Sequence, residues 1–352
     1  MDDDRDGIDS TALNVYQQRW WGASSSTLKE YRILEVPDDN GIVIGRLEYV
    51  IKRDAAAASI GRFFLRRGGA THWAHLGGPT IREGLSSERQ SEVLDKIISS
   101  LPKNISFGFI YDPHVSYVDA MREAFERHGF ERSALLTFER HPTGEDVISG
   151  LGGRARNHIR AALARKFSIG TIDAKTFIQF YNSNLKALGK SSYAPLSVAL
   201  TLIEEGLKRK QVHLFAARQK DSGELSGAIA CFSDRTKFYY SMSTHAHYDK
   251  CDPRRRQNED AIKCLLVTAM YDAQRQGLIY STEGTPVDGA VWLHAEILAL
   301  GKHTFRREVQ TRLAPLRIVC DAAARRLPPS ITRFLNARLE SVLLLESVRK
   351  HR

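Results

Sequence analysis

Alternating hydrophobic and polar residues predict a strand-rich start to the chain. Residues 31–36 and 41–53 alternate with the period of two that a half-buried strand requires. Residues 37–41, Pro-Asp-Asp-Asn-Gly, lie between them and have the composition of a tight turn, so we expect a hairpin. Residues 62–67 and 71–77 are further strand candidates.

The pattern then changes to one in which helices and strands alternate. Residues 86–100 begin with a serine cap and carry apolar residues at helical spacing, which predicts an amphipathic helix. Residues 107–113 predict a short buried strand, and residues 118–130 a helix that ends at a glycine. Residues 131–140 predict another strand.

A similar order of elements follows in the second half of the chain. The expected helices and strands, in order, are helices 173–188 and 195–209, strands 212–218, 225–233 and 237–244, helix 258–277, strand 279–284, helix 290–301 and strand 303–312. The fold class is therefore α/β (α+β), with mixed central sheets flanked by helices. We expect a first domain over residues 1–150, a second over 151–313 and a helical extension over 314–352.

Several short motifs resemble those of a known family at matching order and spacing. They are Gly78-Pro79, Asp112-Pro113, Gly129-Phe130 and the basic pattern Arg156, Ile159, Arg160, Ala162 and Gly170. In the order and spacing of these motifs, the chain from about Trp20 to about Arg307 resembles the Fem family. The resemblance implies two tandem GNAT-like acyltransferase domains. It also implies transfer of an amino acid from aminoacyl-tRNA to an amine, typically of a peptidoglycan precursor.

The chain departs from the family pattern at two places. Ser281 stands where members commonly have an aspartate, and Ile297 stands where they tend to have a lysine. In the family that lysine is implicated in steadying negative charge near the reaction centre. A divergent acceptor or a different acyl donor is therefore open.

The chain has an excess of basic residues, most of which are arginine. The 352 residues carry a net charge of +10, and 35 of the 51 basic residues are arginine. Arginine makes bidentate phosphate contacts, so the excess fits a phosphorylated or polyanionic partner, although a solvated basic surface would have the same composition. The first ten residues are acidic, unlike a secretory signal, and no apolar run approaches the ~18–20 residues of a membrane span. We expect a reduced, cytoplasmic protein without a transmembrane segment.

A basic segment at the start of the second half is the first candidate binding site. Residues 150–155 satisfy a dinucleotide-binding pattern, but no strand is expected directly before them, so we reject that reading. On a helix, Arg156 and Arg160 share a face and Arg154 lies close by. We expect these three arginines to bind substrate, with the pair gripping a phosphate of the acceptor. A solvated helix is the alternative.

Two further groups are candidates for contact with substrate. Arg254, Arg255 and Arg256 directly precede the long helix at 258–277, where acetyltransferases hold the pyrophosphate of coenzyme A in a glycine-rich turn. This segment has three arginines and no glycine, so it suits the spaced phosphates of tRNA better than the compact pyrophosphate of coenzyme A. Tyr239 and Tyr240 are adjacent on one strand, so one faces each side of the sheet. One is expected to reach the substrate and the other to be core.

The expected chemistry needs a proton acceptor and no metal. Aminoacyl esters are already activated, so the enzyme positions the partners, removes a proton from the ammonium and stabilises the oxyanion. Candidate bases are Asp112, Glu283 and His245. The alternating His245, His247, Asp249 and Cys251 could imitate a metal cluster, but we expect an irregular loop and no metal.

The sequence therefore predicts an aminoacyltransferase that forms an amide bond, with aminoacyl-tRNA as co-substrate and no cofactor. The acceptor is an amine, with or without a phosphate group, of a peptidoglycan precursor, a small peptide or a metabolite, and no DNA partner is expected. A GNAT-type N-acyltransferase that uses acyl-CoA is the alternative, and a non-catalytic binding module is a more distant one. The amino acid, the acceptor and the oligomeric state are left open.

Overall fold

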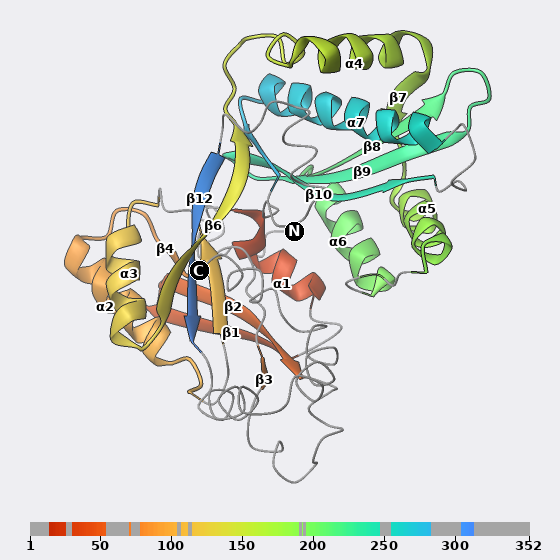
Figure 1. The fold of residues 1–352 in the computed structure, drawn as a ribbon. Coiled ribbons are helices and arrows are strands. Elements are labelled where there is room, and N and C mark those ends of the chain that lie inside the picture. Colours follow the sequence, from red (N-terminus) through yellow and green to blue (C-terminus); the bar gives the residue numbers. More distant parts are fainter. Residues whose placement is uncertain are drawn as a thin grey trace, which may run out of the picture. The chain divides into compact units, whose positions relative to one another are not determined.

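A computed structural model shows a chain of two compact units (Figure 1). It describes residues 14–25, 30–53, 70–71, 78–103, 107–111, 115–189, 192, 195–246, 255–282 and 304–312. The first unit comprises Met1–Leu135 and Arg306–Arg352, and the second comprises Leu136–Phe305. The expected division at 150/151 thus lies at 135/136, inside a continuous strand, and the chain returns to the first unit near its C-terminal end.

The first unit begins with the expected hairpin. Strands β1 (Glu30–Pro37) and β2 (Val43–Arg53) pair antiparallel. The Asp38 side chain accepts hydrogen bonds from the backbone N–H of Asn40 at 2.9 Å and of Ile42 at 2.8 Å. Gly41 has a φ of +81°, which a side chain would strain. The turn chemistry predicted from residues 37–41 is confirmed.

Helices of the first unit end and pack as their sequences predict. The other elements of this unit are α1 (Arg19–Ser25), β3 (Ala70–Thr71), β4 (Thr80–Ile81), α2 (Ser87–Ser99), β5 (Phe107–Tyr111), α3 (Val118–Arg127) and β12 (Thr304–Arg312). Ser86 caps α2, because its hydroxyl accepts the Arg89 backbone N–H at 3.3 Å. Gly129 follows α3 with a φ of +75°. Strand β12 pairs antiparallel with β5, which explains why the chain returns to this unit.

The second unit is built on a mixed sheet in the order β6-β11-β10-β9-β8-β7. Its elements are β6 (Glu131–Arg140), α4 (Gly153–Arg165), β7 (Phe167–Thr171), α5 (Ala174–Ala187), α6 (Leu196–Lys208), β8 (Val212–Gln219), β9 (Leu225–Ser233), β10 (Lys237–His245), α7 (Arg255–Arg275) and β11 (Ile279–Ser281). The meander of β8, β9 and β10 is confirmed. Strand β7 was not predicted, α7 begins three residues earlier than expected, and β11 is shorter than the predicted 279–284.

Helices cover both faces of this sheet. Figure 1 shows α7 on one face, with α4 outside it, and α5 and α6 on the other. Gly227 on β9 allows α7 to lie close, because a Cβ there would meet the side chains of Ala261 and Ile262 at 3.3 Å. The α7 face carries the core of the unit, including Phe238, Leu265 and Tyr280.

A buried ion pair spans the sheet over its shortest strand. Strand β11 lies between β6 and β10, and Lys237 Nζ on β10 lies 2.7 Å from Glu139 Oε1 on β6. The two side chains are 7% and 3% exposed. Two strand spacings separate β6 from β10 by about 10 Å, so the long lysine side chain must cross over β11 to make this contact. The pair thereby holds the strands β6, β11 and β10 together.

We predict that Lys237→Met destabilises the protein by about 3–5 kcal/mol, because Glu139 would remain buried without this cation. The double variant Lys237→Met/Glu139→Leu should recover most of the loss, since both charges are gone. The measurement is the free energy of unfolding in urea. Lys208→Met is the matched control: Lys208 is 69% exposed in its pair with Glu205, and its loss should cost less than about 1 kcal/mol. Equal effects at the two lysines would refute the role given to the buried pair.

Candidate functional site

The candidate site of the second unit begins where its two parallel strands separate. Strands β10 and β11 run parallel and are paired only from Lys237–Ile279 to Tyr239–Ser281, after which β10 continues to His245. In open α/β sheets, ligands bind beyond the carboxyl ends of parallel strands. We call this end of β10 and β11 the carboxyl-end site.

A β-bulge lies at the same position. The register between β10 and β9 shifts between Tyr240 and Met242, so Ser241 has no register partner on β9. Its pairing with β11 has also ended by this point, and Ser241 is exposed. A bulged residue leaves its backbone N–H outside the ladder, where it can face a ligand. No sequence pattern indicated this bulge.

Two predicted residues lie at the carboxyl-end site. Tyr240 is half-buried against the core beneath α7, and its hydroxyl lies 2.5 Å from Ser243 Oγ. His245 is exposed at the end of β10, with Nδ1 3.2 Å from the carbonyl oxygen of Ala246. The site thus combines a hydroxyl pair, an exposed bulge residue and an imidazole. Such groups can donate to a carbonyl oxygen and accept a proton from an amine.

Tyr239 and Tyr240 are both candidate substrate-binding residues, of which one was expected to be core, and the surroundings of Tyr239 are structural. It faces the other side of the sheet and is 1% exposed. Its hydroxyl donates to Asp234 Oδ2 at 2.5 Å. Asp234 also accepts the backbone N–H groups of Thr236 and Lys237, which closes the turn between β9 and β10, and burial raises the pKa of its carboxyl. Tyr239 therefore secures this turn and belongs to the core.

The arginines of α4 share a surface, as their spacing predicts. Arg154 and Arg160 are exposed and Arg156 is half-buried. Arg156 Nη1 reaches the Ser149 carbonyl oxygen at 3.5 Å, and Arg160 Nη2 lies 3.8 Å from Asp146 Oδ2. These long contacts leave both guanidinium groups able to donate hydrogen bonds to a phosphate.

An acidic group limits what this surface can bind. Asp146 accepts a hydrogen bond from the Tyr271 hydroxyl, and this bond is the main reason that the pKa of its carboxyl is lowered. Asp146 therefore stays ionised at neutral pH beside Arg160. A phosphate at Arg160 must be bound well enough to overcome repulsion by this carboxylate.

The remaining predicted site residues are described only in part. Asp112, Glu283 and Arg254 lie outside the described residues, and so do His247, Asp249 and Cys251. Arg255 and Arg256 form the first turn of α7, which begins earlier than predicted, while the positions of their side chains are not described. Within the described ranges, no group of three His, Cys, Asp or Glu side chains could hold a metal ion. No helix in that part of the chain is long and apolar enough to cross a membrane.

The structure also brings together a Ser-His-Asp arrangement that sequence reasoning did not find. His213 Nε2 lies 2.9 Å from Ser233 Oγ, and His213 Nδ1 lies 3.3 Å from Asp272 Oδ2. The imidazole also packs on Phe238, with 4.6 Å between ring centroids. Burial lowers the pKa of His213, so a neutral imidazole accepts from the serine and donates to the aspartate. Because Ser233 is 4% exposed, the arrangement links two strands to α7 rather than presenting a nucleophile.

Comparison with known proteins identifies the fold. Neither a protein-family model nor a curated protein matches the sequence. Among solved structures, the chain is similar to FemX, with a TM-score of 0.61 and 12% identity over 87% of this chain and 94% of that one. It is also similar to a conserved protein of unknown function from Bacteroides thetaiotaomicron VPI-5482, with a TM-score of 0.56 and 12% identity over 88% and 96% of the two chains. The chain therefore has a Fem-like α/β fold, as its motifs predicted.

The buried imidazole gives a pH-dependent prediction. The unfolded chain binds a proton at His213 near pH 6.5, whereas the folded protein binds it only at lower pH. Neutral His213 therefore makes its full contribution to the free energy of unfolding above about pH 6.5, and this contribution falls as the pH drops through that value. In His213→Gln, the free energy of unfolding should vary less between pH 7 and pH 5.5 than in the native protein, as urea titrations at each pH will measure.

Comparing His213→Gln with the native protein removes the effect of the other titrating groups, because both proteins contain them. Asp234 contributes with the opposite sign, because its raised pKa lets the folded protein bind a proton first as the pH falls. Identical pH slopes for the two proteins would show that His213 is not buried as a neutral group.

Proposed function

We propose that the protein is an aminoacyltransferase that moves an amino acid from aminoacyl-tRNA to an amine. The observation that supports this most is the carboxyl-end site, where the parallel β10–β11 pair ends at an exposed bulge within a FemX-like fold. The fold supports a transferase in general, and the choice of donor rests on charge and on the sequence motifs.

The transfer replaces an ester with an amide. The acceptor amine attacks the carbonyl carbon that joins the amino acid to the tRNA 3′ end. A C–N bond forms, the C–O bond breaks, and the tRNA hydroxyl leaves with a proton. The hydroxyls of Tyr240 and Ser243 are suited to stabilise the oxyanion of the intermediate, and so is the backbone N–H of Ser241, which has no register partner on β9.

A base must remove the proton that the attacking ammonium carries. His245 is exposed on the same strand as the bulge, so it can exchange protons with solvent. Of the three predicted bases it is the one within the described residues, and Asp112 and Glu283 stay predictions.

Phosphates of the two substrates are assigned to two basic segments. Arg156 and Arg160 on α4 have long, weak contacts and are proposed to hold a phosphate of the acceptor, with Arg154 beside them. Arg254, Arg255 and Arg256 are proposed to contact the tRNA backbone where α7 begins. The net charge of +10 favours a polyanionic donor over a small neutral one.

The donor class is tested by transfer of a labelled amino acid from charged tRNA to a pool of amine acceptors. We expect transfer that ends on ribonuclease treatment and weakens steeply with salt, because phosphate contacts release counterions. Replacing Arg254, Arg255 and Arg256 by Gln should reduce the salt slope of tRNA binding by about 0.7–0.9 per lost contact. Activity that survives ribonuclease and follows added acyl-CoA would replace this proposal with an acyl-CoA-dependent N-acyltransferase.

The acceptor assignment is tested with Arg160→Ala. We expect acceptor binding to weaken about tenfold to a hundredfold, which corresponds to about 1.5–3 kcal/mol for a contact with a charged group. Binding of tRNA should be unchanged, and the two affinities are measured separately by titration calorimetry. Arg165→Ala, in the exposed last turn of the same helix, is the matched control and should alter neither affinity. Loss of tRNA binding alone in Arg160→Ala would contradict the assignment.

A further inference from the structure

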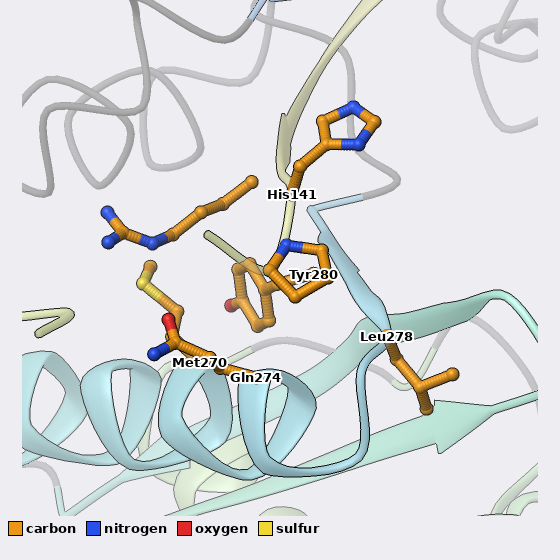
Figure 2. Close-up of a pocket in the computed structure, with 7 residues that line it drawn as sticks. His141, Met270, Gln274, Leu278 and Tyr280 are labelled. Carbon is orange, nitrogen blue, oxygen red and sulfur yellow. The ribbon is translucent and has the colours of Figure 1, made fainter. Parts of the chain in front are cut away.

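The last residues of β10 carry the candidate base but have a neighbouring strand on one side only. Up to Tyr239 the strand is held by β11, which is itself packed beneath α7, as Figure 2 shows for Tyr280 beside Met270. Within the part of the chain that the structure describes, residues 242–245 pair only with β9. The bulge at Ser241 interrupts that ladder as well. A contact outside the sheet is therefore needed to fix this end of the strand.

One buried hydrogen bond ties the end of β10 to α5. Asn184 Nδ2 donates to Thr244 Oγ1 at 2.8 Å, and the two residues are 9% and 6% exposed. The other buried residues of α5 are Ala174, Phe177 and Ile178, so Asn184 is a polar group on an otherwise apolar buried face. An apolar residue there would avoid the cost of burying an amide, whereas a satisfied polar pair fixes one orientation of the strand.

The direction of the Thr244 side chain determines where its neighbours point. Successive side chains of a strand alternate between the two faces, so a Thr244 directed at α5 places Ser243 and His245 on the α7 face. Their register partners on β9 agree with this. Ile229, opposite Ser243, belongs to the core beneath α7. A Cβ on Gly227, opposite His245, would meet side chains of α7.

The bulge brings Tyr240 to the same face as these two residues. In regular alternation Tyr240 would share a face with Thr244, because the two are an even number of residues apart. The extra residue at Ser241 reverses this, so that Tyr240 packs against the core beneath α7 and its hydroxyl reaches Ser243 Oγ. Strand β10 therefore presents its candidate catalytic side chains on one face and is anchored through the other.

We propose that Asn184 is a positioning residue for the transfer reaction. Through Thr244 it holds the end of β10 so that Ser243 and His245 meet the substrates. This role rests on the proposed function, whereas the anchoring itself does not. Because Asn184 acts through the strand and contacts neither substrate, its hydrogen bond should affect the rate of the chemical step rather than the binding of aminoacyl-tRNA. A misplacement of about 1 Å at a reaction centre can cost about a hundredfold in rate.

The test is transfer of a labelled amino acid from charged tRNA by Thr244→Val, which keeps the shape of the side chain and removes its hydroxyl. We expect kcat to fall about tenfold to a hundredfold while the KM for aminoacyl-tRNA is unchanged. Thr244→Ser keeps the hydroxyl and should retain most of the native kcat. Ser183→Ala removes an exposed hydroxyl one residue before Asn184, and as the matched control it should change neither constant.

The double variant Asn184→Leu/Thr244→Val separates positioning from stability. Thr244→Val alone leaves the Asn184 amide buried without this acceptor and should lower the midpoint of thermal unfolding, whereas the double variant removes both polar groups and should recover the midpoint. Its kcat should stay at least about tenfold below the native value, because two apolar side chains do not fix one orientation. Recovery of both midpoint and kcat would show a merely structural role and overturn the proposal, as would a native kcat in Thr244→Val.

Amide hydrogen exchange, measured by mass spectrometry without substrates, tests the anchoring independently of the reaction. We expect residues 242–246 to exchange at least about tenfold faster in Thr244→Val than in the native protein, while exchange in β8 is unchanged. Equal exchange at residues 242–246 in the two proteins would refute the anchor even if the enzyme is active. Faster exchange in a protein whose native form transfers nothing from charged tRNA would instead contradict the proposed function, and with it the positioning role, while confirming the anchor.

Discussion

The position of one very short strand constrains the chemistry of the second unit. Strand β11 contributes three residues to the sheet between β6 and β10, and a strand of that length has too few backbone hydrogen bonds to fix its own place. The Lys237–Glu139 ion pair crosses it on one face, while Tyr280 inserts into the core on the other. The strand is therefore held mainly by side chains, and its end determines where β10 becomes free to bulge and bind.

The ion pair is retained at a cost that an apolar pair would avoid. Two buried charges lose their hydration, and their mutual attraction in a short contact offsets that loss only in part. An apolar replacement could pack equally well, but it would specify less strictly how β6 and β10 are aligned. We infer that the pair selects the alignment in which Tyr280 faces α7 and Ser281 faces the other side. The carboxyl-end site depends on that alignment.

Much of the fold could be predicted because local signals agree with the tertiary structure. The Asp38–Gly41 turn, the Ser86 cap and the Gly129 helix end each have a chemical reason within a few residues of sequence. Strand β7 escaped prediction because its five residues follow a basic helix directly and alternate too briefly to be noticed. The boundary between the units escaped because β6 continues through it without a break in pattern.

Only those features of the candidate site could be predicted that follow from the spacing of residues within one helix or strand. The shared face of Arg156 and Arg160 follows from helical spacing, and the opposite faces of Tyr239 and Tyr240 follow from strand alternation. The bulge at Ser241 and the meeting of His213, Ser233 and Asp272 depend on register between strands and on how α7 crosses them, which no local pattern encodes.

Arg140 is a residue whose burial could not be predicted from its position in the sequence. At the end of an alternating strand, a basic residue ordinarily indicates that the strand is leaving the core for solvent. Here the following segment, through Gly150, folds back against the guanidinium and buries it beside Tyr280 and Gln274. The sequence contains the charge but does not encode its enclosure, because the enclosure depends on residues that meet only in the folded chain.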